Sequence, residues 1–220
     1  GNEPPPGRPA PGGRPSRAAR MPARGLLTLV PVYWFLGGMF ATIDVTTVAF
    51  AASRGHKPLA GLWLGLYALS SAFGGLWYGS RHWHAPLARR FAVTLGCTVA
   101  GVATFWLVPG LAVLAVVMLA TGLAISPTLI AGYGLIEQQA PAGRRTEGMS
   151  WLSSSISLGV AAGSPVAGHL IDAFGPRWGY VFAAACGAAA LLTCLAGMTW
   201  LRHRPARRGG TAPEPASSPA

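Results

Sequence analysis

Long uncharged runs of apolar residues alternate with short polar segments along the whole chain. Six runs have 18 residues or more, close to the run of about 20 that an α-helix needs to cross a bilayer core. They are Leu26 to Phe50, Pro58 to Ser80, Phe91 to Val108, Leu111 to Ile136, Met149 to Ile171 and Trp178 to Leu201. None alternates apolar and polar residues as a barrel strand does. The pattern therefore predicts an all-α, polytopic membrane protein with six transmembrane helices.

Composition supports a membrane protein over a soluble one. Of the 220 residues, 51% are hydrophobic and 10% are charged, whereas soluble domains have about 25% charged residues. The formal net charge of +11 is typical of some nucleic-acid-binding proteins, but here the cations flank the apolar runs instead of forming a basic stripe. We therefore expect the lipid bilayer, and no nucleic acid, among the partners.

The distribution of Lys and Arg predicts the orientation of the helices. Fourteen of the seventeen lie in the two tails and in the loops after the second and fourth runs. The other three loops hold only Arg54, Lys57 and Arg177. Because cytoplasmic loops carry the excess of Lys and Arg, we expect a multi-pass protein of the plasma (inner) membrane with both termini in the cytoplasm.

Gly, Pro, Ala and Arg dominate the two ends of the chain, residues 1–25 and 202–220. Segments of this composition cannot bury enough apolar area to offset the entropy of ordering. We expect two disordered cytoplasmic tails around a membrane domain of residues 26–201. The first tail is alternatively the remnant of a central loop in a longer protein, or the chain starts near Met21.

Two segments at the ends of the second and fifth runs share a Gly-x-Leu spacing. One is Gly74 to Tyr78 and the other is Gly168 to Asp172, and the predicted topology puts them on opposite sides of the membrane. This arrangement predicts that helices one to three and four to six are inverted copies, as in many secondary transporters.

Three segments in the second half of the chain resemble the Major Facilitator Superfamily. Residues Gly168 to Arg177 are similar to its Gly-x-Leu-x-Asp-Arg-x-Gly loop signature. In the segment that begins at Gly74, Tyr78 and Gly79 stand where the signature has Asp and Arg. The stretch from Gly159 to Gly168 is similar to a glycine-proline motif best known in drug/proton antiporters. The loop from Gln138 to Gly148 is also similar to the family's.

The resemblance covers nearly all of residues 26–201 and implies the carboxyl-terminal half of a twelve-helix transporter. It implies a secondary active transporter of a small molecule that works by alternating access, with efflux of drug-like or metabolite compounds as the expected direction. A six-helix half needs a partner, either the missing amino-terminal half or a second copy. The alternative is a non-transporting membrane partner or a degenerate transporter remnant.

Asp44 carries the only formal charge in the six runs. A carboxyl group within a membrane span costs free energy unless it is protonated, paired with a cation or exposed to water. Residues of this kind therefore often bind a substrate or a coupling ion. The alternative is a structural hydrogen bond, or a wetted position near the outer surface.

Polar residues of the fourth run recur along one helix face. Ser126, Ile130, Tyr133 and Glu137 follow the spacing of that face, and Pro127 frees a backbone carbonyl beside it. The resemblance makes Ser126 and Tyr133 candidate substrate contacts. Alternatively, Tyr133 is an interfacial aromatic residue and Glu137 a solvated residue at the helix end.

Charged residues in two loops are candidates for a gate or latch. Arg144, Arg145 and Glu147 could form a salt-bridged cytoplasmic gate, or the arginines could simply anchor the loop. Glu147 suits the first turn of the fifth helix, for which Thr146 is the predicted cap. At the outer turn, the loop resemblance makes Asp172 a candidate latch, which could pair with Arg177.

Small residues form a stripe along the fifth run. The stripe consists of Ser150, Ser154, Ser157, Ala161, Ser164 and Gly168, with Gly159 and Gly163 beside it. Because small residues let helices approach closely in lipid, we expect Gly159, Gly163 and Gly168 to mediate helix packing and the stripe to face a neighbouring helix. A hydroxyl-lined path for substrate is the alternative.

An intramembrane enzyme is the main competing class. Ser150 and His169 could suggest a serine hydrolase, but on one helix they lie about 28 Å apart and cannot meet. No Cys, His or carboxylate spacing suits a metal, and there is no glycine-rich phosphate loop followed by lysine. We expect no enzymatic activity and no cofactor.

Overall fold

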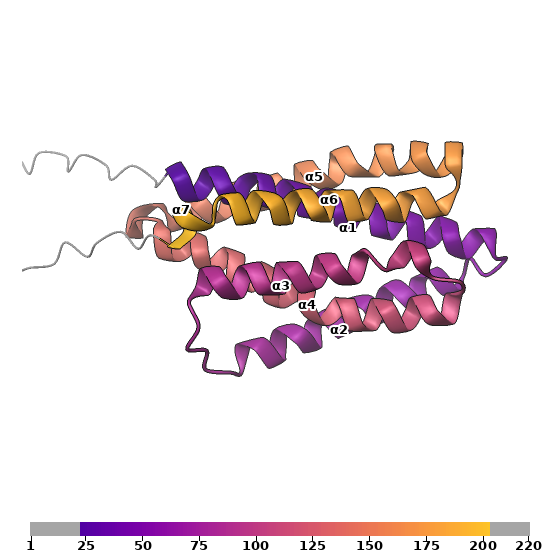
Figure 1. The fold of residues 1–220 in the computed structure, drawn as a ribbon, viewed down its shortest axis with the longest axis horizontal. Coiled ribbons are helices and arrows are strands. Elements are labelled where there is room, and N and C mark those ends of the chain that lie inside the picture. Colours follow the sequence, from indigo (N-terminus) through magenta and orange to yellow (C-terminus); the bar gives the residue numbers. More distant parts are fainter. Residues whose placement is uncertain (1–22, 203–220) are drawn as a thin grey trace, which may run out of the picture.

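The computed structural model describes residues 23–202 and consists of helices joined by short turns (Figure 1). The α-helices are α1 (Ala23–Ser53), α2 (Leu59–Gly79), α3 (Leu87–Val102), α4 (Leu111–Gln139), α5 (Arg145–Phe174), α6 (Pro176–Ala196) and α7 (Met198–Arg202). Two 3₁₀ turns, η1 (Phe105–Leu107) and η2 (Ala142–Arg144), precede α4 and α5. Each predicted run coincides with one of the long helices α1 to α6, with ends that differ by a few residues. The all-α prediction is confirmed.

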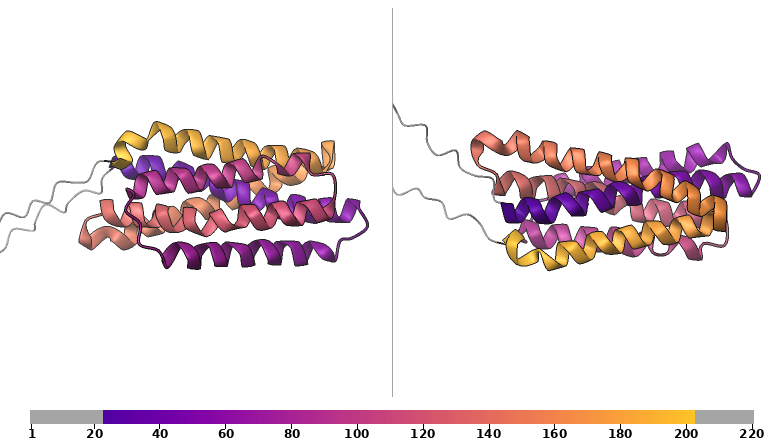
Figure 2. Two further views of the ribbon diagram at one scale, coloured as in Figure 1. Left: turned by 60° about the horizontal axis from the view of Figure 1, so that its bottom comes forward. Right: turned by 90° about the horizontal axis from the view of Figure 1, so that it is seen from above.

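Five of these helices have the length and composition of a membrane span: α1, α2, α3 with η1, α4 and α6. Helix α5 is long enough, with 30 residues, but its serines make it more polar than the other five. It still runs along the bundle between the same two ends as α1 and α6 (Figure 1). Both ends of the described chain consequently lie at one end of the bundle, as Figure 2 shows.

Gly and Pro residues form two of the turns and one of the helix starts. A single residue, Gly175, joins α5 to α6, and its φ of 89° is a conformation that side chains disfavour. Pro176 then begins α6, where its missing N–H costs nothing. Gly55, with φ of 75°, makes the corresponding turn after α1.

Helices α1 and α4 hold the bundle together. The most extensive contacts of α1 are with α5 and α6, and those of α4 are with α2 and α3. Exchanging α1 with α4, α2 with α5, and α3 with α6 maps these contacts onto each other. The contact pattern is that of two inverted three-helix units.

The closest backbone contacts repeat between the two units. An added Cβ at Gly74 of α2 would overlap the Leu123 carbonyl of α4, and one at Gly163 of α5 would lie 2.7 Å from the Cα of Gly38 on α1. Gly159 of α5 makes the contact that matches that of Gly74, because its added Cβ would overlap the carbonyl of Trp34 on α1. The predicted pairing with Gly168 is wrong in register, because an added Cβ at Gly168 would meet nothing within 4 Å.

Apolar side chains fill the interior and also cover the outside. Tyr33, Phe91, Phe105 and Tyr180 are fully buried between the helices. Many large apolar side chains point outward from the same helices, as lipid contact requires. Exposed tryptophans lie near both ends of the bundle, as interfacial residues do in membrane proteins: Trp83 and Trp151 near one end, Trp106 and Trp178 near the other.

Candidate functional site

The predicted polar face of α4 is present, and its hydroxyls connect α4 to helices on both sides. Ser126 is half-buried, and its Oγ lies 2.7 Å from the Oγ of Ser71 on α2. Tyr133 is half-buried, and its hydroxyl lies 3.0 Å from the Oγ of Ser153 on α5. Glu137, one turn further along α4, is exposed.

Tyr33 of α1 joins this group. Its hydroxyl donates a hydrogen bond of 2.9 Å to the Leu129 carbonyl of α4. Its ring packs edge-on against Tyr133, with 5.3 Å between ring centres. The chain Tyr33, Tyr133, Ser153 thus connects α1, α4 and α5. The sequence analysis missed Ser153 and did not place Tyr33 here, although a tyrosine within an apolar run is itself a signal.

Asp44 lies elsewhere, on the exposed side of α1. It lines a groove of about 580 Å³ between α1 and α2, whose other walls are Val45, Val48, Leu64, Tyr67 and Ala68. The side chain of Tyr67 is 7% exposed, and its hydroxyl has no hydrogen-bond partner among the described residues. A carboxylate and an unused hydroxyl therefore line one otherwise apolar groove.

The two polar groups are separated along the membrane direction. Asp44 follows Tyr33 by eleven residues on α1, which is about 16 Å along a helix axis. Asp44 is therefore nearer the turn between α1 and α2, whereas Tyr133 and Glu137 are nearer the opposite end of the bundle. The structure does not bring Asp44 together with Ser126, Tyr133 and Glu137.

The charged residues after α4 form two separate exposed ion pairs. Arg145 contacts Glu137 and Arg144 contacts Glu147, each with 3.5 Å between nitrogen and oxygen. Their side chains are about half exposed, and such pairs contribute about 0–1 kcal/mol each. Glu147 lies in the first turn of α5 as expected, but Thr146 does not cap that helix, because α5 already begins at Arg145.

Asp172 and Arg177 flank the turn between α5 and α6. Both side chains are exposed, and the ion pairs found in residues 23–202 do not include one between them. The two residues are therefore near in sequence but not paired in this conformation. Ser150 and His169 lie toward opposite ends of the continuous helix α5, so they cannot act on one substrate atom.

The packing face of α5 agrees only in part with the predicted one. The buried stripe against the bundle consists of Gly148, Leu152, Ser155, Gly159, Gly163 and Ala167. An added Cβ at Gly159 would overlap the carbonyl of Trp34 on α1. Gly159 and Gly163 thus pack as predicted. Gly168 makes no such contact, and Ser150, Ser154 and Ser157 of the serine stripe point outward, away from α1.

Within residues 23–202, no three His, Cys, Asp or Glu side chains gather closely enough to hold a metal ion. Cys97, Cys186 and Cys194 are free thiols. Within the described residues, the groups that could bind a ligand include hydroxyls, the Asp44 carboxylate and charged side chains near the two ends of the bundle.

Comparison with known proteins gives a family match over nearly the whole chain. The sequence model described as Major Facilitator Superfamily matches residues 3–219. No curated protein and no solved structure matches the chain.

Proposed function

The chain belongs to the Major Facilitator Superfamily, whose members are membrane transporters, and from this we propose that it moves a small molecule by alternating access. Energy would come from an ion gradient or from the gradient of the substrate itself. The inverted three-helix units support this proposal, because secondary transporters are commonly built from such units.

The Asp44 groove is the observation on which the proposed mechanism rests. Asp44 is the acidic residue within the predicted spans, and it shares the groove with the unused hydroxyl of Tyr67. A carboxylate at this position can bind a proton or a cationic group, and the hydroxyl can bind a second polar atom. Val45, Val48 and Leu64 supply apolar walls. We therefore assign Asp44 to coupling or substrate binding.

Efflux is the direction we propose, with drug-like or metabolite compounds as substrates. The proposal rests on the stretch from Gly159 to Gly168, which is similar to a motif of drug/proton antiporters. A groove with one carboxylate and apolar walls is suited to a lipophilic cation. The polar residues of α4, Ser126 and Tyr133, would contact substrate deeper in the bundle.

A second six-helix unit completes the proposed transporter. It is either an amino-terminal half or a second copy, and it would cover the outward serines of α5. The alternation of Lys and Arg supports a plasma-membrane protein with both termini and the ion pairs of Glu137 and Glu147 in the cytoplasm. Those ion pairs would act as a gate, and Asp172 as a latch at the other side.

Transport by Asp44 variants tests the proposal. The protein, produced from its own gene, is incorporated into liposomes, and movement of a fluorescent lipophilic cation is followed with and without a proton gradient. We expect Asp44→Asn to abolish gradient-driven movement and Asp44→Glu, which keeps the carboxylate, to retain part of it. Yield and helical content of both variants serve as controls.

Equal transport by the two variants would remove Asp44 from the mechanism. Absence of transport by the unaltered protein, tested over a panel of neutral, anionic and cationic compounds, would favour the alternative of a non-transporting membrane partner.

A further inference from the structure

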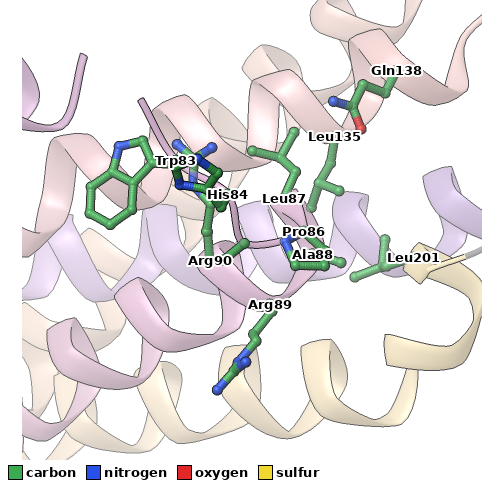
Figure 3. Close-up of a pocket in the computed structure, with 11 residues that line it drawn as sticks. Trp83, His84, Pro86, Leu87, Ala88, Arg89, Arg90, Leu135, Gln138 and Leu201 are labelled. Atoms are coloured by element: carbon green, nitrogen blue, oxygen red, sulfur yellow. The ribbon is translucent and has the colours of Figure 1, made fainter. Parts of the chain in front are cut away.

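Two adjoining cavities lie at the arginine-rich end of the bundle, between α2, α3 and α4. The larger has a volume of about 820 Å³ and lies around the start of α3 (Figure 3). The smaller, of about 410 Å³, extends along α3 and α4. Trp83, Ala85, Arg89 and Arg90 line both, so the two cavities are neighbours. This region is separate from the Asp44 groove.

Arg90 is the central charge of this region, and it has no acidic partner among residues 23–202. Its guanidinium lies over the rings of Tyr78 and Trp83, at 4.5 and 5.0 Å from the ring centres. Figure 3 shows it turned toward Trp83 and His84, while Arg89 projects away from them. No Asp or Glu lines either cavity, and the ion pairs among residues 23–202 use Arg144 and Arg145.

Two buried polar atoms here lack hydrogen-bond partners among the described residues. They are the Nε of Arg90 and the hydroxyl of Tyr78, whose side chain is only 4% exposed and lines the smaller cavity. A buried donor without a partner costs about 1–3 kcal/mol. Helix α3 adds to the positive potential, because it begins after Pro86 with no side-chain cap and no acidic residue in its first turn. These groups together favour the binding of an anion.

Away from Tyr78 and the arginines, the walls of the smaller cavity are mostly apolar. Val93, Cys97, Leu123 and Ala124 form its sides along the membrane-spanning parts of α3 and α4. Trp77 and Trp83 stand edge to face at its mouth, with 5.7 Å between ring centres, as aromatic residues do at headgroup depth. An anion bound by Arg90 would therefore lie at the entrance of an apolar slot that faces lipid.

We propose that the two cavities form a binding site for an anionic phospholipid. Arg90 binds the phosphate, His84 and Arg89 line the rim, and one acyl chain enters the slot beside Cys97. A free phosphate would use only the charged part of the site, whereas a phospholipid fills both parts. Anionic lipid in the leaflet at the arginine-rich end supplies the ligand.

Lipid binding to the purified protein in detergent tests this proposal. Native mass spectrometry would give Kd values for phosphatidylglycerol, phosphatidylcholine and soluble glycerol phosphate. We expect phosphatidylglycerol to bind at least about tenfold more tightly than either of the others. The choline cation of phosphatidylcholine is repelled by Arg89 and Arg90, and glycerol phosphate has no acyl chain to fill the slot.

Three variants separate the parts of the site. Arg90→Gln should weaken phosphatidylglycerol binding by about tenfold. Cys97→Trp should weaken it comparably, because the indole fills the slot while the charges remain. Arg54→Gln is the matched control, since Arg54 also lies over an aromatic ring, at 4.9 Å from the centre of Phe50, but at the opposite end of the bundle.

Equal binding of phosphatidylglycerol and phosphatidylcholine would overturn the assignment of an anionic ligand. If glycerol phosphate bound as tightly as phosphatidylglycerol, or if Cys97→Trp had no effect on binding, the assignment of a lipid as the ligand would be overturned. Unchanged helical content of each variant in circular dichroism would show that any loss of binding is local.

Discussion

Individual glycines determine how closely α5 approaches α1. An added Cβ at Gly159 would overlap the carbonyl of Trp34, whereas one at Gly168 on the same helix would meet nothing within 4 Å. Lipid provides no hydrophobic force between helices, so close packing at such positions carries the association. The importance of a glycine in this protein thus depends on its place along the helix.

Replacing these two glycines by alanine should have opposite outcomes. We expect Gly159→Ala to lower the free energy of unfolding by about 1–3 kcal/mol, because the methyl group forces α1 and α5 apart. Gly168→Ala should leave it unchanged or raise it by up to about 1 kcal/mol, since alanine favours helix. Thermal unfolding of the purified protein in detergent, followed by circular dichroism, measures both. Similar losses in the two variants would contradict the described contact.

Helix α5 has two faces of small residues, and only one packs against the bundle. The buried face is that of Gly159 and Gly163, and the outward face carries Ser150, Ser154 and Ser157. Periodicity identifies both faces, but it contains no information about which one meets α1. The sequence analysis therefore assigned packing correctly to Gly159 and Gly163, but it also assigned packing to the serine stripe, which faces away from α1.

The outward serine face should be accessible to water if a second unit and a substrate path adjoin it. In a Cys97→Ala background, we expect Ser157→Cys to react with a water-soluble maleimide markedly faster than Leu192→Cys, which lies exposed on α6. Reaction rates in native membranes provide the measurement. Ser155→Cys, on the buried face, controls for access through the bundle. Equally slow reaction of Ser157→Cys and Leu192→Cys with the maleimide would indicate that lipid covers both positions.

For the whole molecule, sequence patterns were sufficient for the helices but not for the site. Length and hydropathy are local properties, so the six runs coincide with α1 to α6. The hydrogen bond between Tyr33 and Leu129 and the groove shared by Asp44 and Tyr67 join distant segments. The predicted register of the repeat was wrong for the same reason, since Gly74 and Gly159 correspond through their contacts and not through a shared motif.

The orientation of the whole bundle has a direct test. Lys57 lies in the turn between α1 and α2, and His82 in the loop between α2 and α3, and both side chains are exposed. In the Cys97→Ala background, Lys57→Cys should react with an impermeant maleimide in intact cells, and His82→Cys only after permeabilisation. The reverse pattern would place the arginine-rich loops outside.

The two inverted units do not have the same conformation. Between α4 and α5 the contact of Tyr133 with Ser153 joins the helices, whereas the corresponding space between α1 and α2 holds the groove of Asp44 and Tyr67. Exchanging the two conformations would produce a state related to this one by a two-fold rotation, with the groove shut at one end and a new opening at the other. Residues at which the units differ would then set the equilibrium between the states, and substitutions there would shift their populations without loosening the shared glycine contacts.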